Sequence, residues 1–291
     1  MKTFPSLDVL REYRDSGLYT MAALTTELYA DLRTPVEVLR ILRARGSHCF
    51  LFESAEDKER WGRFSFLGLD PGLTVSCRDG ELKIGEKTSR TAHPKKEIRE
   101  LMRNYRAPRI EGLPPFTGGL VGYFAYDYIK YAEPTLRLAE GGGEGFQDVD
   151  LMLFTKLIAF DHYRQKMVLI VNVALDRLEE NYEDALKTLE ELRELVHREP
   201  PREGASGRVL SPFRSQFTEA EYAALVEKTR RHIYEGDVFQ LVLSNRLEAA
   251  FEGSLLDTYR ALRSLNPSPY LFFLSSPTLE VAGASPETLV K

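Results

Sequence analysis

The sequence contains very little cysteine. Cys49 and Cys77 are the two cysteines among 291 residues, and neither belongs to a CxxC motif or to a cysteine–histidine pattern of metal ligands. Two isolated cysteines cannot supply the set of bridges that holds small secreted domains together. The sequence therefore excludes a disulfide scaffold and a structural zinc site, and it predicts two reduced, partly buried thiols.

Long hydrophobic runs are also missing. The longest apolar stretch, residues 167–175, is interrupted by Asn172 and is far shorter than the roughly 20 residues that cross a bilayer as a helix. The N-terminal residues have no apolar core of the length that a signal peptide needs. We therefore expect a cytoplasmic protein with no membrane partner.

Positive charge is not in excess. The 39 lysines and arginines are outnumbered by 44 aspartates and glutamates, so the formal net charge is −5. This balance argues against nucleic acid as a partner, although it leaves room for a local basic pocket that receives a small anion. Hydrophobic residues make up 43% of the chain, which is enough for the core of one large domain or two ordinary ones.

Familiar catalytic motifs are absent as well. The sequence has no nucleophile elbow, no P-loop, no GxGxxG and no HExxH. Its five histidines are scattered with no shared partner: His48, His93, His162, His197 and His232. Motifs alone therefore lead no further than an α+β enzyme with two domains.

Capping signals predict the helices. Two helices each begin with a threonine N-cap and a glutamate three residues later, and each ends at a glycine: Thr34, Glu37 and Gly46 in the first, Thr218, Glu221 and Gly236 in the second. Asn181 is expected to cap a third helix that runs to about His197. Ser254 is expected to cap a fourth.

Apolar runs predict the strands. We expect strands at residues 49–53 and 121–128, and an antiparallel hairpin from the runs 151–160 and 166–175. Residues 238–250 alternate in the manner of a further strand.

Residues 198–215 form the best linker, because they are rich in proline, glycine, serine and arginine and have no apolar period. We expect one domain over residues 1–197 and the start of another over residues 216–291. The chain stops at Lys291 directly after a series of apolar elements. We therefore expect a polypeptide that is shortened at its C-terminus.

Six groups of residues, in order along nearly the whole chain, carry a resemblance to a known family. Together they resemble component I of anthranilate synthase: ELYADLRTPV (27–36), LFES (51–54) with WGRFSFLG (61–68), PFTGGLVGYFAYD (115–127), GDVFQLVLS (236–244), NPSPY (266–270) and GASPE (283–287). The resemblance implies an α+β fold of layered antiparallel β-sheets flanked by helices. Residues 1–197 would be the family's N-terminal domain, and residues 216–291 would begin its chorismate-binding domain.

The resemblance also implies a lyase of tryptophan biosynthesis. The family converts chorismate and ammonia to anthranilate and pyruvate with Mg²⁺, and a glutamine amidotransferase subunit supplies the ammonia. Its motifs for metal, substrate and general acid follow the GASPE segment and are absent from this sequence. We therefore place no metal ligand in residues 1–291, and we expect this polypeptide alone to be inactive.

Gln240 is the one catalytic candidate. Related enzymes that add water to chorismate have a lysine base at the matching position. An amide cannot act as a base near neutral pH, but ammonia already has its lone pair and needs positioning by hydrogen bonds. On a strand, Gln240 would share a face with Val238, Val242 and Ser244. Without the resemblance, a hydrogen bond from Gln240 to the backbone at a strand edge is the favoured interpretation.

A second site is regulatory in the family, where tryptophan binds as an inhibitor. Carried over to this sequence, the site comprises Glu53, Ser54, Asn266, Ser268, Pro269, Tyr270 and Leu271. The carboxylate and the hydroxyl could take the ammonium group of the ligand, and the prolines could form a rigid rim for its indole ring. Phe52 and Leu271 replace the more usual leucine and methionine in the pocket wall.

Two other functions stay open. Aminodeoxychorismate synthase component I shares the Gly-Gly, Tyr-Asp and Gly-Asp-x-x-Gln motifs, whereas residues 31–35, 52–54 and 241–244 look more like the anthranilate branch. The chain could also be a non-catalytic module that binds tryptophan.

Overall fold

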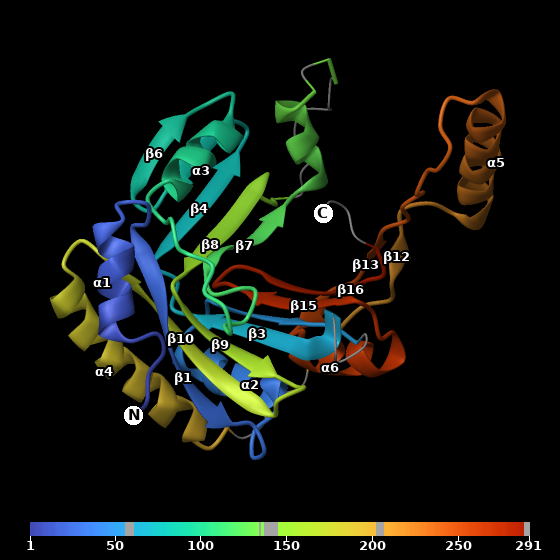
Figure 1. Ribbon diagram of the computed structural model, residues 1–291. Helices are drawn as coiled ribbons and strands as arrows, with labels where there is room; N and C mark the ends of the chain where they lie inside the picture. Colours follow the sequence, from blue (N-terminus) through green and yellow to red (C-terminus); the bar gives the residue numbers. More distant parts are fainter. Residues whose placement is uncertain (56–60, 134, 137–144, 202–206, 288–291) are drawn as a thin grey trace. The chain divides into compact units, whose positions relative to one another are not determined.

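The computed structural model describes residues 1–55, 61–133, 135–136, 145–201 and 207–287. The chain folds as two compact units (Figure 1). The first comprises Met1–Arg202 and Tyr259–Lys291, and the second comprises Glu203–Thr258. The boundaries expected from the sequence, at residues 197 and 216, refer to the domains of the family rather than to these compact units, and they stay a prediction.

The first unit is built on an antiparallel sheet of seven strands in the order β1-β10-β9-β3-β2-β15-β16. Its strands are β1 (Met21–Tyr29), β2 (Cys49–Glu53), β3 (Phe64–Leu69), β9 (Lys156–Asp161), β10 (Lys166–Ala174), β15 (Tyr270–Ser275) and β16 (Glu280–Ser285). The strand expected at residues 49–53 and the antiparallel pairing of the runs near 160 and 166 are thereby confirmed.

A second antiparallel sheet of five strands has the order β6-β5-β4-β8-β7. Its strands are β4 (Leu73–Arg78), β5 (Glu81–Ile84), β6 (Lys87–Arg90), β7 (Gly119–Phe124) and β8 (Val149–Phe154). Apolar side chains from both sheets form one buried cluster, including Phe50 on β2 and Phe154 on β8. The layered antiparallel α+β fold that the sequence predicts is confirmed.

The chain passes from one sheet to the other at Thr155. We expected one strand over residues 151–160, but β8 and β9 are separate strands in different sheets. The side-chain amide of Asn172 donates to the carbonyl oxygens of Thr155 (3.1 Å) and Thr117 (2.6 Å) at this crossing. The sequence shows one continuous apolar run here because nearly every side chain of both strands is buried.

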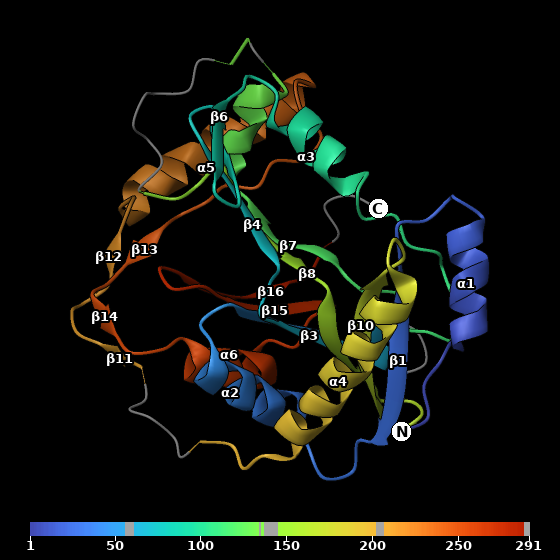
Figure 2. The same ribbon diagram turned by 90° about the vertical axis from the view of Figure 1, so that its left-hand side faces the viewer.

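Helices cover the outer face of the seven-stranded sheet, and Figure 2 shows α2, α4 and α6 along it. The α-helices of the chain are α1 (Leu7–Asp15), α2 (Pro35–Arg45), α3 (Pro94–Met102), α4 (Leu178–His197), α5 (Glu219–Glu235) and α6 (Leu256–Leu265). The described residues also contain two 3₁₀ segments, η1 (Trp61–Arg63) and η2 (Tyr126–Tyr131). Among the described residues, no helix is both long and apolar enough to span a membrane.

The capping predictions fare differently from helix to helix. Both threonine boxes are confirmed, since the Thr34 and Thr218 hydroxyls accept from the backbone three residues on while the glutamates accept in return. The cap expected at Asn181 is wrong, because α4 already starts at Leu178. The Asn181 amide instead donates back to the Ala174 carbonyl at 2.9 Å.

Another correction concerns residues 121–128, which we expected to be one strand. The strand β7 ends at Phe124, and Tyr126–Tyr131 form the 3₁₀ segment η2. The Tyr131 hydroxyl donates to Asp148 at 2.7 Å, and Lys130 pairs with the same carboxylate at 2.8 Å. These contacts hold η2 on the smaller sheet and so end the strand early.

The second unit contains the helix α5 and two short ladders. β11 (Arg208–Val209) pairs with β14 (Phe251–Glu252), and β12 (Arg214–Ser215) pairs with β13 (Leu247–Glu248). The strand expected over residues 238–250 is therefore wrong, because within the described residues 238–246 pair with no other strand. Alternation alone does not make a strand, since its backbone groups need a neighbour.

Both cysteines are buried and unbridged, as expected. Burial raises the pKa of the Cys49 thiol to about 12, which makes it a poor nucleophile near neutral pH. These thiols serve packing.

Candidate functional site

The end of β2 lies beside the start of β15 in the first unit. Glu53 and Leu271 are directly opposite each other in the antiparallel register, and the Ala55 amide donates to the Ser268 carbonyl at 3.0 Å. The two segments are more than 200 residues apart in the sequence, since Tyr259, which precedes the second segment, already follows Glu53 by 206 positions. The structure thus brings together the two groups of residues that we predicted to form one site, 53–54 and 266–271.

The loop between α6 and β15 is short and held at both ends. The backbone N–H of Asn266 donates to the Leu262 carbonyl at 2.9 Å, which closes the last turn of α6. Ser268 is buried, and its hydroxyl donates to the Tyr270 carbonyl at 3.1 Å. Pro269 restricts the backbone between them, so the loop presents a fixed rim beside Ser54.

The carboxylate of Glu53 is the most constrained group of this region. Arg263 approaches it with two nitrogens, Nη2 at 2.9 Å from Oε1 and Nε at 2.7 Å from Oε2. The Tyr259 hydroxyl donates to Oε2 at 2.8 Å. Glu53 is only 9% exposed and Tyr259 is fully buried, and burial together with the Glu53 charge raises the pKa of the tyrosine.

These contacts bear on the expected role of Glu53. A buried carboxylate that already has a forked arginine and a hydroxyl donor has its charge neutralised inside the protein. Taking the ammonium of a ligand would require this carboxylate to leave Arg263. The main role of the Glu53 side chain is therefore to bind Arg263 and Tyr259 within the protein.

Ser65 on β3 and His162, directly after β9, extend this network. The Ser65 hydroxyl lies 3.5 Å from Glu53 Oε1 and 2.7 Å from His162 Nε2. The tautomer of His162 sets which of the two groups donates in the shorter bond. The sequence prediction missed these contacts, although Tyr259 and Arg263 are four residues apart and so share a helix face.

The two departures from the family's usual pattern point to opposite faces of the sheet. Leu271 is buried on the same face as Glu53, because the two are directly paired. Phe52 pairs with Phe272 and packs into the cluster between the sheets, with its ring 4.8 Å from that of Phe50. Phe52 and Leu271 therefore cannot line the same pocket on one face of the sheet.

Gln240 lies in the second unit. It is exposed and lies in residues 238–246, which form no strand within the described part of the chain, so the shared strand face predicted for Gln240, Val238, Val242 and Ser244 does not form. Its neighbour Phe239 is 93% exposed. The catalytic role of Gln240 stays a prediction from the resemblance.

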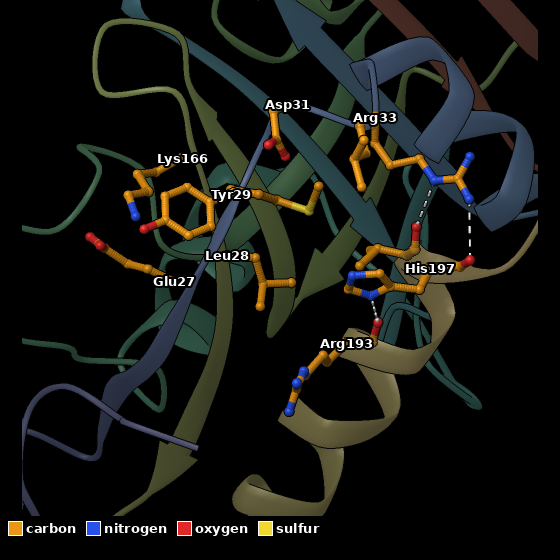
Figure 3. A pocket seen from close by; sticks show the side chains of 11 residues that line it. Glu27, Leu28, Tyr29, Asp31, Arg33, Lys166, Arg193 and His197 are labelled. Atoms are coloured by element: carbon orange, nitrogen blue, oxygen red, sulfur yellow. Dashed lines mark hydrogen bonds between the residues drawn. The ribbon is translucent and has the colours of Figure 1, made fainter.

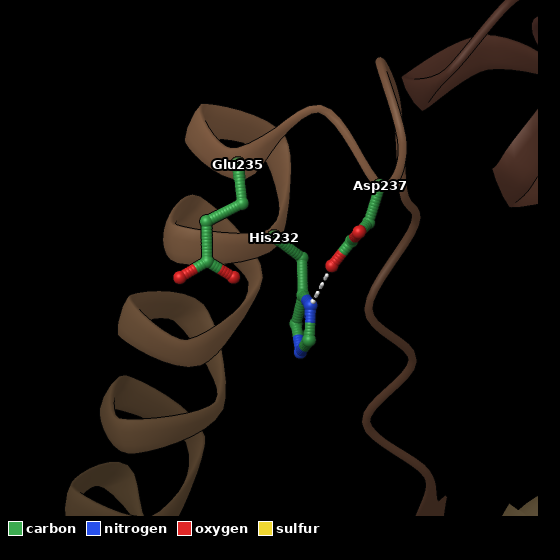
Figure 4. A group of neighbouring side chains, drawn as sticks. All are labelled: His232, Glu235 and Asp237. Atoms are coloured by element: carbon green, nitrogen blue, oxygen red, sulfur yellow. Dashed lines mark hydrogen bonds and ion pairs between the residues drawn. The ribbon is translucent and has the colours of Figure 1, made fainter.

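One group in the second unit has the spacing of metal ligands. Within the described residues, His232, Glu235 and Asp237 are the one set of three such side chains whose ligand atoms lie within 4.8 Å of one another (Figure 4). Mg²⁺ prefers oxygen ligands, whereas here His232 Nδ1 bonds Asp237 at 2.8 Å. This set does not fit magnesium. The bond between His232 and Asp237 instead connects the last turn of α5 with the residue that follows its C-cap.

A cavity of about 670 Å³ lies between the end of β1, the start of β10 and the end of α4 (Figure 3). The Arg33 guanidinium donates to the carbonyls of Val196 and His197 at 3.2 and 3.1 Å. The ammonium of Lys166 lies 3.7 Å from the centre of the Tyr29 ring. Arg33 thus caps the C-terminus of α4, and its charge serves the fold.

Comparison with known proteins agrees with the geometry of the first unit. The sequence profile of the chorismate binding enzymes matches residues 18–291. Anthranilate synthase component 1 of Pseudomonas aeruginosa is 37% identical over 287 residues, which is 94% of this chain and 57% of that protein. The same component of Aquifex aeolicus is 34% identical over 302 residues, with 98% of this chain and 59% of the relative covered.

A solved structure gives the same result. Anthranilate synthase component I of Streptococcus pneumoniae superimposes with a TM-score of 0.64 at 31% identity, over 78% of this chain and 51% of that one. The profile match over residues 18–291 and the structural similarity identify the enzyme family of this chain. This chain belongs to the chorismate binding enzymes, and it spans less than two thirds of the length of the relatives named here.

Proposed function

We propose that this chain is part of component I of an anthranilate synthase. The complete enzyme would convert chorismate and ammonia to anthranilate, pyruvate and water. The observation that carries this proposal is the identity of 31–37% with curated proteins of that name over nearly the whole chain. Chorismate as the substrate class also agrees with the family profile over residues 18–291.

The remaining parts of the proposal come from the resemblance. A glutamine amidotransferase subunit would supply the ammonia, and Mg²⁺ would bind to residues outside this sequence and supply a positive charge for the substrate's carboxylates. We expect the 291-residue polypeptide to form no anthranilate from chorismate, ammonium and Mg²⁺.

Gln240 would orient ammonia for attack on the chorismate ring. An amide can accept and donate hydrogen bonds but cannot remove a proton near neutral pH, which suits ammonia better than water. The test is Gln240→Lys in a full-length protein that carries this sequence. We expect ammonium-dependent formation of anthranilate, followed by its fluorescence, to fall at least tenfold. An unchanged rate would contradict the positioning role.

The regulatory proposal is that tryptophan binds at the end of β2 beside the loop 266–270. The adjacency of these segments supports it, because Ala55 and Ser268 are hydrogen-bonded and Glu53 pairs with Leu271. Calorimetric titration of the 291-residue chain with L-tryptophan tests it. Saturable binding that Ser54→Ala weakens would support the site, and the absence of binding would contradict it.

The second candidate, aminodeoxychorismate synthase component I, makes a different product from the same substrate. Residues 31–35 and 241–244 favour the anthranilate branch. Chromatography of the products made by a full-length protein decides between them. Binding of tryptophan without turnover in that protein would instead support a non-catalytic module.

A further inference from the structure

We propose that Arg263 and Tyr259 are positioning residues for the tryptophan site, which they build by clamping Glu53 against α6. This inference rests on the proposed regulatory function. The clamp is the set of contacts among Glu53, Tyr259 and Arg263. None of the three contacts the ligand through its side chain in this proposal.

The chemistry of the clamp makes it rigid. The Glu53 carboxylate receives two nitrogens of Arg263 at 2.7 and 2.9 Å and the hydroxyl of Tyr259 at 2.8 Å. Forked arginine–carboxylate pairs fix orientation as well as distance. Because the carboxylate is buried, removing one partner leaves an unsatisfied charge or donor in a site that water does not reach freely.

The position of the clamp in the chain gives it an effect on the loop. Arg263 lies on the last turn of α6, and the loop 266–269 follows directly. The other side of the loop is tied to β2 by the backbone bond from Ala55 to Ser268 and by the pairing of Glu53 with Leu271. The loop is therefore held by α6 on one side and by β2 on the other, and Glu53 takes part in both ties.

A small additional contact supports the same arrangement. The Tyr259 ring packs against Phe273 of β15, with 5.8 Å between the ring centres, and the Arg263 guanidinium lies 5.9 Å from the Tyr259 ring centre. The helix face that carries the clamp is thus also packed on the strand that follows the loop. Movement of α6 would move the rim of the proposed pocket.

A direct role and a positioning role make different predictions for double variants. If Glu53 itself bound the ligand's ammonium, Glu53→Gln would weaken binding far more than Arg263→Gln. If the clamp positions the loop, either substitution breaks the same unit. The double variant Glu53→Gln/Arg263→Gln should then bind tryptophan no more weakly than either single variant.

The experiment is calorimetric titration of the 291-residue chain with L-tryptophan, with a thermal melt of each variant. We expect Arg263→Gln to raise Kd at least tenfold and Arg263→Lys to recover part of the loss. Tyr259→Phe, which keeps the ring packing, should raise Kd two- to fivefold. Arg177→Gln is the matched control, because it breaks an exposed arginine–glutamate pair of the same unit, and it should leave Kd unchanged.

Hydrogen exchange gives a second readout that needs no ligand. The Ala55 amide should exchange at least tenfold faster in Arg263→Gln than in the parent, and Arg177→Gln should match the parent. If the parent does not bind tryptophan, the regulatory proposal fails, and unchanged exchange at Ala55 would separately overturn the clamp. If Arg263→Gln does not fold, Arg263→Lys and Tyr259→Phe carry the test, and Kd and exchange at parental values in both would overturn the inference.

Discussion

The two units of this chain differ in how far their apolar side chains are buried. In the first unit, Tyr259 and Phe50 are fully buried, and the helices α2 and α4 bury one face each. In the second unit, α5 buries no residue, and Phe239 and Val242 are 93% and 81% exposed. The comparison shows that an amphipathic sequence gives side chains a fixed position only where other helices or strands pack against it.

The largest expected effect tests this comparison through two phenylalanines. Phe50→Ala should lower the free energy of unfolding by about 3–5 kcal/mol, because it opens a cavity in the cluster between the sheets. Phe239→Ala should change it by less than about 0.5 kcal/mol, because the side chain is almost fully exposed. Unfolding in urea measures both, and equal losses would remove the distinction between the units.

A smaller effect concerns an ion pair of the first unit in which the carboxylate is buried and the arginine is partly exposed. Burial opposes ionisation of Asp161, but Arg63 at 2.7 Å and backbone donors outweigh it, so the pKa of this carboxyl is lowered. The stabilisation is present above the ordinary carboxyl range and is lost as pH falls below about 4. Asp161→Asn should cost about 2 kcal/mol at pH 7 and flatten the acid limb of the stability curve.

The measurement for Asp161 is a set of urea titrations between pH 7 and pH 3. Asp184→Asn is a suitable control, since Asp184 forms an exposed pair with Lys187 on α4. A control that loses as much stability as Asp161→Asn would show that burial of the pair is not the cause.

The smallest expected effect compares two identical capping boxes. Thr34→Ala and Thr218→Ala each remove the hydroxyl that caps a helix N-terminus, at a cost of about 1 kcal/mol to the helix. In α2, which is packed on the sheet, this loss should appear in unfolding of the first unit. In α5 it should appear as lower helix content by circular dichroism, with little change in that transition.

The elements that could be predicted from the sequence have local causes. The boxes at Thr34 and Thr218 specify their helices within four residues, and Gly236 ends α5 in the left-handed region that glycine favours. The division at Thr155 could not be predicted, because both strands beside it are apolar on both faces. Residues 238–246 alternate but pair with no strand in the described ranges, and only a neighbouring strand makes an alternating segment part of a sheet.

The candidate site shows the same limit. The adjacency of residues 53–54 and 266–271 came from the resemblance, and the strand register confirms that they are neighbours. The contacts of Glu53 were missed because hydrogen-bond partners depend on which helix packs on which strand. The spacing of Tyr259 and Arg263 was a usable signal, but it gave no indication of the strand that would face them.

The central position of β2 in its sheet has a consequence for biosynthesis. β15 is one of its two neighbours, and Tyr259 follows Glu53 by 206 residues. While the ribosome is still making the intervening chain, β2 is therefore an open edge whose backbone groups have no partner on that side. A nascent chain halted before Tyr270 would expose an apolar edge, and chaperones that bind such edges should retain it.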